Sequence, residues 1–226
     1  MRAHCLIEAA RVSVFGDMLG FDGGLLRDSV TAALLHDGNK EQEVAEIEKA
    51  IRMGDSGRAA SVAAAAKYME KLKSKKVSSR TVNFIHLVGG MPETLIEIKK
   101  ILNKKSLNSE DLAALVVHYV DDYTRNDEWV LSAERQDGKI INDVDRRAEK
   151  NRTSPRYEKI YKEITEIVRA HPFFTGMTSL QAAISISHEI EEKIALILAA
   201  RSGTRITPCD VPEEVERKIK GVNIFI

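Results

Sequence analysis

The stretch Ala32-Ala33-Leu34-Leu35-His36-Asp37 joins an apolar run to two side chains of types that commonly bind metals. An imidazole and a carboxylate at the end of a buried helix lose solvation energy unless a charged group or an ion interacts with them. Neutral imidazole and carboxylate suit Mn, Fe, Co, Ni or Zn, but a helix C-terminus also favours histidine through its dipole. The dyad therefore predicts a metal site only if further ligands lie elsewhere in the chain.

The sequence on both sides of this stretch has the periodicity of helices. Apolar residues recur three and four positions apart, and Gly, Pro, Ser, Thr or Asn stands at the expected ends. The pattern predicts helices over 4–19, 25–37, 41–53, 57–76, 93–103, 109–123, 155–170, 179–200 and 212–220. Asn108 or Ser109, and Thr178 or Ser179, are the expected caps. No alternating pattern of strands extends beyond a few residues, so the predicted fold class is all-α.

Composition narrows the classes of partner. The 226 residues carry 34 basic and 34 acidic side chains, so a nucleic acid polymer is not an expected partner. No apolar run approaches the ~20 residues of a membrane span, and the first residues lack the apolar core of a signal peptide. Cys5 and Cys209 lie far apart and form no ligand spacing, which fits a reducing compartment. We expect a cytoplasmic protein without a membrane partner.

Further ligand types occur on other predicted helices. His4 lies near the start of the first helix and shares a face with Glu8 at i, i+4 spacing. Asp121 and Asp122 stand together at the end of a helix that is apolar on all sides until His118. Alternatively, the histidines serve only helix ends, but carboxylates beside buried segments then have no explanation.

This order of residues resembles the HD-domain superfamily of metal-dependent phosphohydrolases, whose pattern is His, then His-Asp, then a distant Asp. The gap of 32 residues between His4 and His36 is similar to that family, and so is Lys40, three residues after the dyad. Gly38 is a departure, because it directly follows Asp37 and the family usually places this glycine one position later.

The last ligand of the family commonly stands as Ala-Asp-x-hydrophobic. Val120-Asp121-Asp122-Tyr123 is similar to that motif, with Val in place of Ala. A shift by one residue would place Thr124 at the hydrophobic position, so the resemblance favours Asp121 over Asp122.

The resemblance covers about residues 1–125 and implies an HD-domain-like helical bundle there. Residues 126–226 are expected to form a helical extension packed on this core. Residues 124–152, where the extension begins, are polar and weakly periodic, which predicts a loop with a short helix. The apolar end Ile224-Phe225-Ile226 can dock on its own domain or on a second copy, so a homo-oligomer stays an open hypothesis.

The resemblance also implies a reaction. A single divalent transition metal would be held by His4, His36, Asp37 and Asp121. Metal-activated water would hydrolyse the phosphate ester of a nucleotide or another small phosphorylated metabolite. Asp37 would also orient the water, and Lys40 would contact the substrate phosphate, which makes these two the expected catalytic residues.

The roles of two histidines and two alternative functions remain open at this point. His86 and His118 are expected to contact substrate, although core packing would equally explain His118. Some members of the superfamily use two extra histidines for a second ion, and the family includes iron-dependent oxygenases. A di-iron oxygenase is therefore one alternative, and a non-catalytic module that senses a ligand or binds a partner is the other.

Overall fold

A computed structural model of the chain describes residues 2–125, 128–129 and 155–221. Its first part contains seven α-helices: α1 (Arg2–Leu19), α2 (Gly23–Leu35), α3 (Lys40–Met53), α4 (Gly57–Ser74), α5 (Ser79–His86), α6 (Pro92–Leu102) and α7 (Ser109–Tyr123). Two-residue strands β1 (Thr124–Arg125) and β2 (Glu128–Trp129) then pair antiparallel. The later part contains α9 (Pro155–Ala170), η2 (Pro172–Phe174), α10 (Ser179–Ser202), η3 (Pro208–Asp210) and α11 (Val211–Gly221).

The predicted all-α class is confirmed for the residues that the structure describes. Polar caps set several of the helix ends. The side chain of Asn108 accepts a hydrogen bond from the backbone of Asp111 in a capping box, and Thr178 does the same for Gln181. Gly203 ends α10 in the left-handed conformation, with φ at 67°. Most of the predicted loop at 124–152 and the apolar tail lie outside the described residues.

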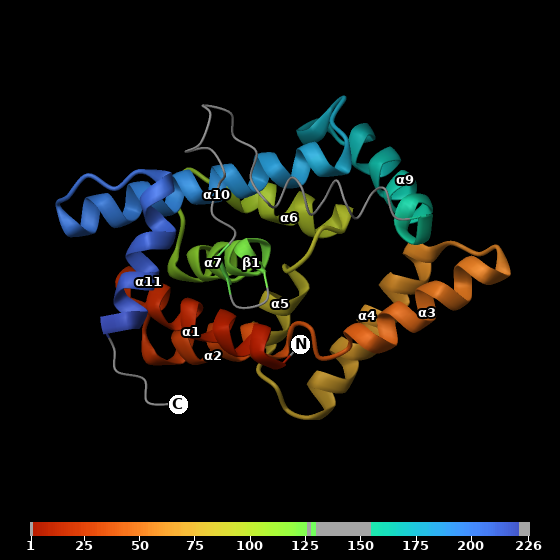
Figure 1. The fold of residues 1–226 in the computed structure, drawn as a ribbon, viewed down its shortest axis with the longest axis horizontal. Coiled ribbons are helices and arrows are strands. Elements are labelled where there is room, and N and C mark those ends of the chain that lie inside the picture. Colours follow the sequence, from red (N-terminus) through yellow and green to blue (C-terminus); the bar gives the residue numbers. More distant parts are fainter. Residues whose placement is uncertain (1, 126–127, 130–154, 222–226) are drawn as a thin grey trace.

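Helix α7 is the centre of the core. Its residues 111–120 are all buried, so the helix is enclosed on every side. Helices α1 and α2 pack on one side of it, and α10 and α6 lie along another (Figure 1). A helix that is apolar all round can only be stabilised in this way. The arrangement places the polar end of α7 beside the ends of α1 and α2.

The packing of the turn after α2 explains why a glycine directly follows Asp37. The hydroxyl of Tyr68, on α4, donates a 2.7 Å hydrogen bond to the carbonyl of Leu35 at the end of α2. A Cβ at Gly38 would lie only 2.2 Å from that hydroxyl. A glycine directly after Asp37 therefore leaves room for a side chain that completes the hydrogen bonds of the helix end.

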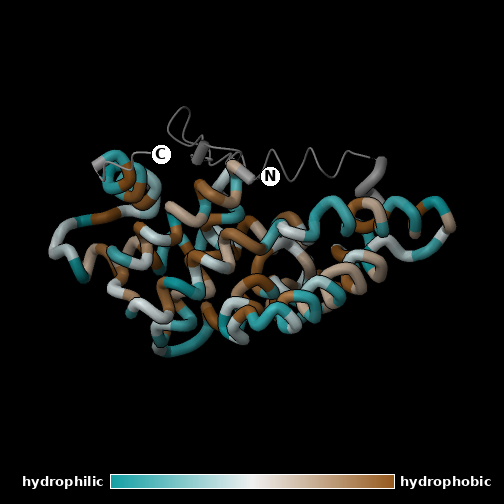
Figure 2. Tube along the Cα trace, turned by 90° about the horizontal axis from the view of Figure 1, so that it is seen from below, coloured by the Kyte–Doolittle hydropathy of each residue, from teal (hydrophilic) through white to brown (hydrophobic). Residues whose placement is uncertain are grey.

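The remaining helices extend the molecule in both directions. Helices α3 and α4 form a hairpin that projects to one side and meets α9 (Figure 1). At the other end, α11 packs on α1, and the apolar core includes Ala9 of α1 and Val215 of α11. Figure 2 shows the elongated outline from below, with hydrophilic stretches at both ends. None of the described helices combines the length and the apolar character needed to cross a membrane.

Candidate metal centre

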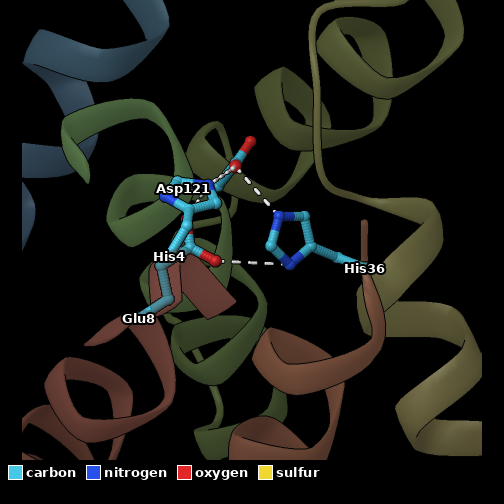
Figure 3. Close-up of side chains that lie close together, drawn as sticks. All are labelled: His4, Glu8, His36 and Asp121. Carbon is cyan, nitrogen blue, oxygen red and sulfur yellow. Dashed lines mark ion pairs between the residues drawn. The ribbon is translucent and has the colours of Figure 1, made fainter. Parts of the chain in front are cut away.

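Four side chains from three helices converge where α1 begins and where α2 and α7 end (Figure 3). His4 and Glu8 come from the first turns of α1, His36 caps the C-terminus of α2, and Asp121 lies in the last turn of α7. One donor atom from each lies within 4.8 Å of all the others. This group could hold a metal ion.

His36 is oriented as a ligand by its backbone contact. Its Nδ1 lies 2.8 Å from the carbonyl oxygen of Ala33, and a carbonyl only accepts, so Nδ1 carries the hydrogen. Nε2 points to the other side of the ring, 3.2 Å from Oδ1 of Asp121 (Figure 3). This buried nitrogen has no partner with hydrogen-bond geometry. Metal-binding histidines commonly donate one ring N–H to a carbonyl and bind the ion with the other nitrogen.

Glu8 is a carboxylate in an unusual environment. Its side chain is only 1% exposed, and neither of its oxygens has a partner with hydrogen-bond geometry. Nε2 of His4 lies 2.9 Å from Oε1, and Nδ1 of His36 lies 3.3 Å from Oε2. Burial raises the pKa of Glu8 to about 7, although its contact with His4 opposes the rise. A buried carboxylate of this kind is stabilised by any cation that enters the group.

The acidic groups raise the pKa of both imidazoles, whereas burial lowers it. Burial lowers the pKa of His36, but contact with Asp121 and the charges of Glu8 and Asp37 outweigh it and raise the pKa to about 10. Contact with Glu8 likewise raises the pKa of His4 against the effect of burial. The group therefore favours positive charge, which protons supply when no ion is bound. Two imidazoles and two carboxylates also form a donor set that suits a divalent transition metal.

The two residues expected to be catalytic lie beside this group. Oδ2 of Asp37 is 3.7 Å from Nε2 of His36, and its side chain is 24% exposed, so it stands at the outer edge of the four-residue group. Lys40 is the first residue of α3; it is 53% exposed and its Nζ lies 3.3 Å from Oε2 of Glu43. Asp37, which the sequence predicted as a metal ligand, is therefore not among the four residues whose donor atoms converge, although it lies beside them; Lys40 lies on the adjoining turn.

The two histidines expected to contact substrate lie apart from the group. His86 is exposed at the end of α5. His118 is 1% exposed, and its Nδ1 donates to the carbonyl of Leu87 over 2.7 Å. Its Nε2 lies 3.4 Å from Oδ2 of Asp122, the same oxygen that accepts a 2.7 Å hydrogen bond from Ser187. Of the two adjacent carboxylates, Asp121 therefore faces His4 and His36, and Asp122 faces His118.

Glu8 is the member of the group that sequence reasoning did not select. Its i, i+4 spacing from His4 placed the two on one face, but an acidic residue near a helix start is common on surfaces. The missing signal was the burial of that face. No family model matches the chain, and comparison with curated proteins and with solved structures also gave no match.

Proposed function

We propose that His4, Glu8, His36 and Asp121 hold a divalent transition metal and that the protein is a metal-dependent phosphohydrolase. The observation that carries this proposal is the convergence of four donor atoms within 4.8 Å, from the start of α1, the end of α2 and the distant helix α7. It is supported by buried atoms of His4, Glu8 and His36 that lack a partner with hydrogen-bond geometry, because such atoms are costly to bury unless a bound ion or added protons compensate them. The order of residues that resembles the HD-domain superfamily supports the choice of reaction.

A single ion of Mn, Fe, Co, Ni or Zn suits this donor set. Bound there, such an ion would lower the pKa of a bound water and polarise a phosphate oxygen of the substrate. On an octahedral ion, four protein donors would leave one position for the water and one for the phosphate oxygen. The expected substrate is the phosphate ester of a nucleotide or of another small phosphorylated metabolite.

The chain's own residues supply the other parts of the reaction. Asp37 is partly exposed beside His36, so its carboxylate can accept a hydrogen bond from the attacking water and hold it in line with the phosphorus. The exposed ammonium group of Lys40 lies on the next turn beside Glu43, and its flexible side chain can turn to contact a phosphate oxygen. The water oxygen would form a bond to phosphorus as the ester P–O bond breaks, and the proton that the water loses would neutralise the leaving alkoxide.

Hydrolysis assays with generic substrates test this proposal. Purified protein loaded with Mn²⁺ or Zn²⁺ is expected to release p-nitrophenol from p-nitrophenyl phosphate or bis(p-nitrophenyl) phosphate. Asp37→Asn should lower the rate by about 100-fold or more, a range typical for a group that handles a proton. Lys67→Gln, an exposed position on α4, serves as the matched control and should keep the wild-type rate.

Three other outcomes would redirect the assignment. Bound metal without hydrolysis of either ester would favour the non-catalytic module. Two irons per chain with consumption of oxygen would favour the oxygenase. Hydrolysis that survives both Asp37→Asn and removal of metal would show that the activity comes from elsewhere.

A further inference from the structure

A cavity of about 610 Å³ lies at the corner where the end of α10, the turn after it and α11 meet the end of α1. Its apolar lining comes from Met18, Leu198 and Ile206. None of its lining residues belongs to the candidate metal centre. Its volume lies within the range of about 300–1,000 Å³ that is usual for small-molecule sites.

Three cationic side chains that line this cavity are not used elsewhere. Within the described ranges, Arg201, Arg205 and Lys218 form no ion pair or hydrogen bond. Three carboxylates also line the cavity, those of Asp210, Glu213 and Glu214, and each has an interaction of its own. Glu214 pairs with Arg217 one turn along α11, and Oδ2 of Asp210 accepts hydrogen bonds from the backbone and the hydroxyl of Thr207.

The course of the backbone brings two of these exposed cations to the cavity. Gly20, at the end of α1, has φ at +66°, and a Cβ there would lie 2.6 Å from Nη1 of Arg201. The guanidinium group of Arg201 is therefore packed against the turn between α1 and α2. Gly203 ends α10 in the left-handed conformation and reverses the chain, which returns Arg205 to the same cavity.

We propose that this cavity binds a small polyanion that carries two or more phosphate groups. Planar guanidinium groups match phosphate oxygens in pairs, and the lysine adds a mobile third charge. With Arg217, the lining carries four cationic and three acidic side chains, so cations are in excess. The apolar residues of the lining can accommodate the organic part of such a ligand. This site goes beyond the proposed hydrolysis and does not depend on it.

Calorimetric titration of the full chain with sodium tripolyphosphate tests the site. The titration is run in about 150 mM NaCl, which screens diffuse surface attraction. The double variant Arg201→Gln/Arg205→Gln should bind at least about tenfold more weakly than wild type, and Lys218→Gln should bind a few-fold more weakly. Arg52→Gln removes an exposed arginine of α3 and should bind as wild type does. Circular dichroism of each variant checks the fold.

One further variant separates this site from the metal centre. His36→Gln should retain tripolyphosphate binding, because His36 does not line the cavity. Binding lost in His36→Gln but kept in the double arginine variant would overturn this inference and place the anion at the metal centre. No binding by wild type at millimolar tripolyphosphate, or equal weakening in Arg52→Gln, would also overturn it. None of these results would remove the proposal of a metal centre.

Discussion

Two neighbouring carboxylates on α7 lie in different surroundings although they differ by one position in the chain. Asp121 faces two imidazoles and the buried Glu8, whose oxygens have no partner with hydrogen-bond geometry. Asp122 faces one imidazole, and Ser187 donates a hydrogen bond to it. Both regions contain a buried histidine whose Nδ1 donates to a carbonyl.

The difference between the regions is therefore the number of converging donors. Around Asp121, three helices bring together four potential ligands, two imidazoles and two carboxylates. Around Asp122, one imidazole and one hydroxyl lie against one carboxylate, and only the Nε2 of His118 lacks a partner with hydrogen-bond geometry among the described buried atoms there. A pair of this kind joins α7 to α10 and to the segment after α5, whereas the larger group fits a cation.

The largest effect is expected from replacing one histidine in each region. His36→Gln should weaken Mn²⁺ or Zn²⁺ binding by at least about 100-fold, since even partners behind the ligands contribute about 10- to 100-fold. His118→Gln keeps an N–H for the carbonyl of Leu87 and should leave affinity within about threefold of wild type. Competition with a chelating dye measures both. Equal losses in the two variants would remove the distinction between the regions.

The adjacent carboxylates give a sharper version of this test. Asp121→Asn keeps the shape of the side chain but removes its charge, and should weaken metal binding by about 10- to 100-fold. Asp122→Asn should change it by less than about threefold. The same competition assay applies. A reversed order would assign the last ligand to Asp122 and would contradict the orientation of α7.

These residues also show how far the sequence could predict the structure. Asn108 and Thr178 marked helix starts because capping is decided by neighbours within one turn. Asp121 was favoured over Asp122 through the surrounding motif, and the structure turns it toward His4 and His36. Glu8 could not be selected, because its role depends on which face of α1 the distant helix α7 covers. Tyr68, which requires the early glycine at Gly38, depends in the same way on a distant packing contact.

Substitutions around His118 are expected to affect the free energy of unfolding rather than metal binding. His118→Leu removes the donor to the carbonyl of Leu87 and the contact with Asp122, and should lower the free energy of unfolding by about 1–3 kcal/mol. Urea denaturation of metal-free protein measures the change. Leu196→Ala, a substitution at an exposed position of α10, is the control and should stay within about 0.5 kcal/mol. A destabilisation no larger than that of the control would show that this pair does not hold α7 in place.

The smallest expected effect is on the pH dependence of the metal-free protein. The folded pKa of Glu8 is raised from 4.5 to about 7, and that of His36 from 6.5 to about 10. Both groups bind protons more tightly when folded, so their stabilising effect is present at low pH and lost as pH rises through the folded values. Stability of the metal-free chain should therefore fall from about pH 4.5, the unfolded pKa of Glu8, to about pH 10, the folded pKa of His36.

Thermal unfolding across this range measures the slope. Glu8→Gln should flatten the part between about pH 5 and 7, because a neutral amide cannot titrate there. In the presence of Zn²⁺ the slope should reverse, since the ion displaces protons from its ligands and binds more tightly at higher pH. An unchanged slope in Glu8→Gln would show that this carboxylate does not titrate as its burial predicts.

The most direct test of the central claim is the metal content of the purified chain. Wild-type protein is incubated with Mn²⁺ or Zn²⁺, freed of excess ion and analysed for metal beside Asp121→Asn and Asp122→Asn. We expect one ion per chain in wild type and in Asp122→Asn, and a clear loss in Asp121→Asn. No bound metal in wild type, or an equal content in all three proteins, would contradict a metal centre formed by His4, Glu8, His36 and Asp121.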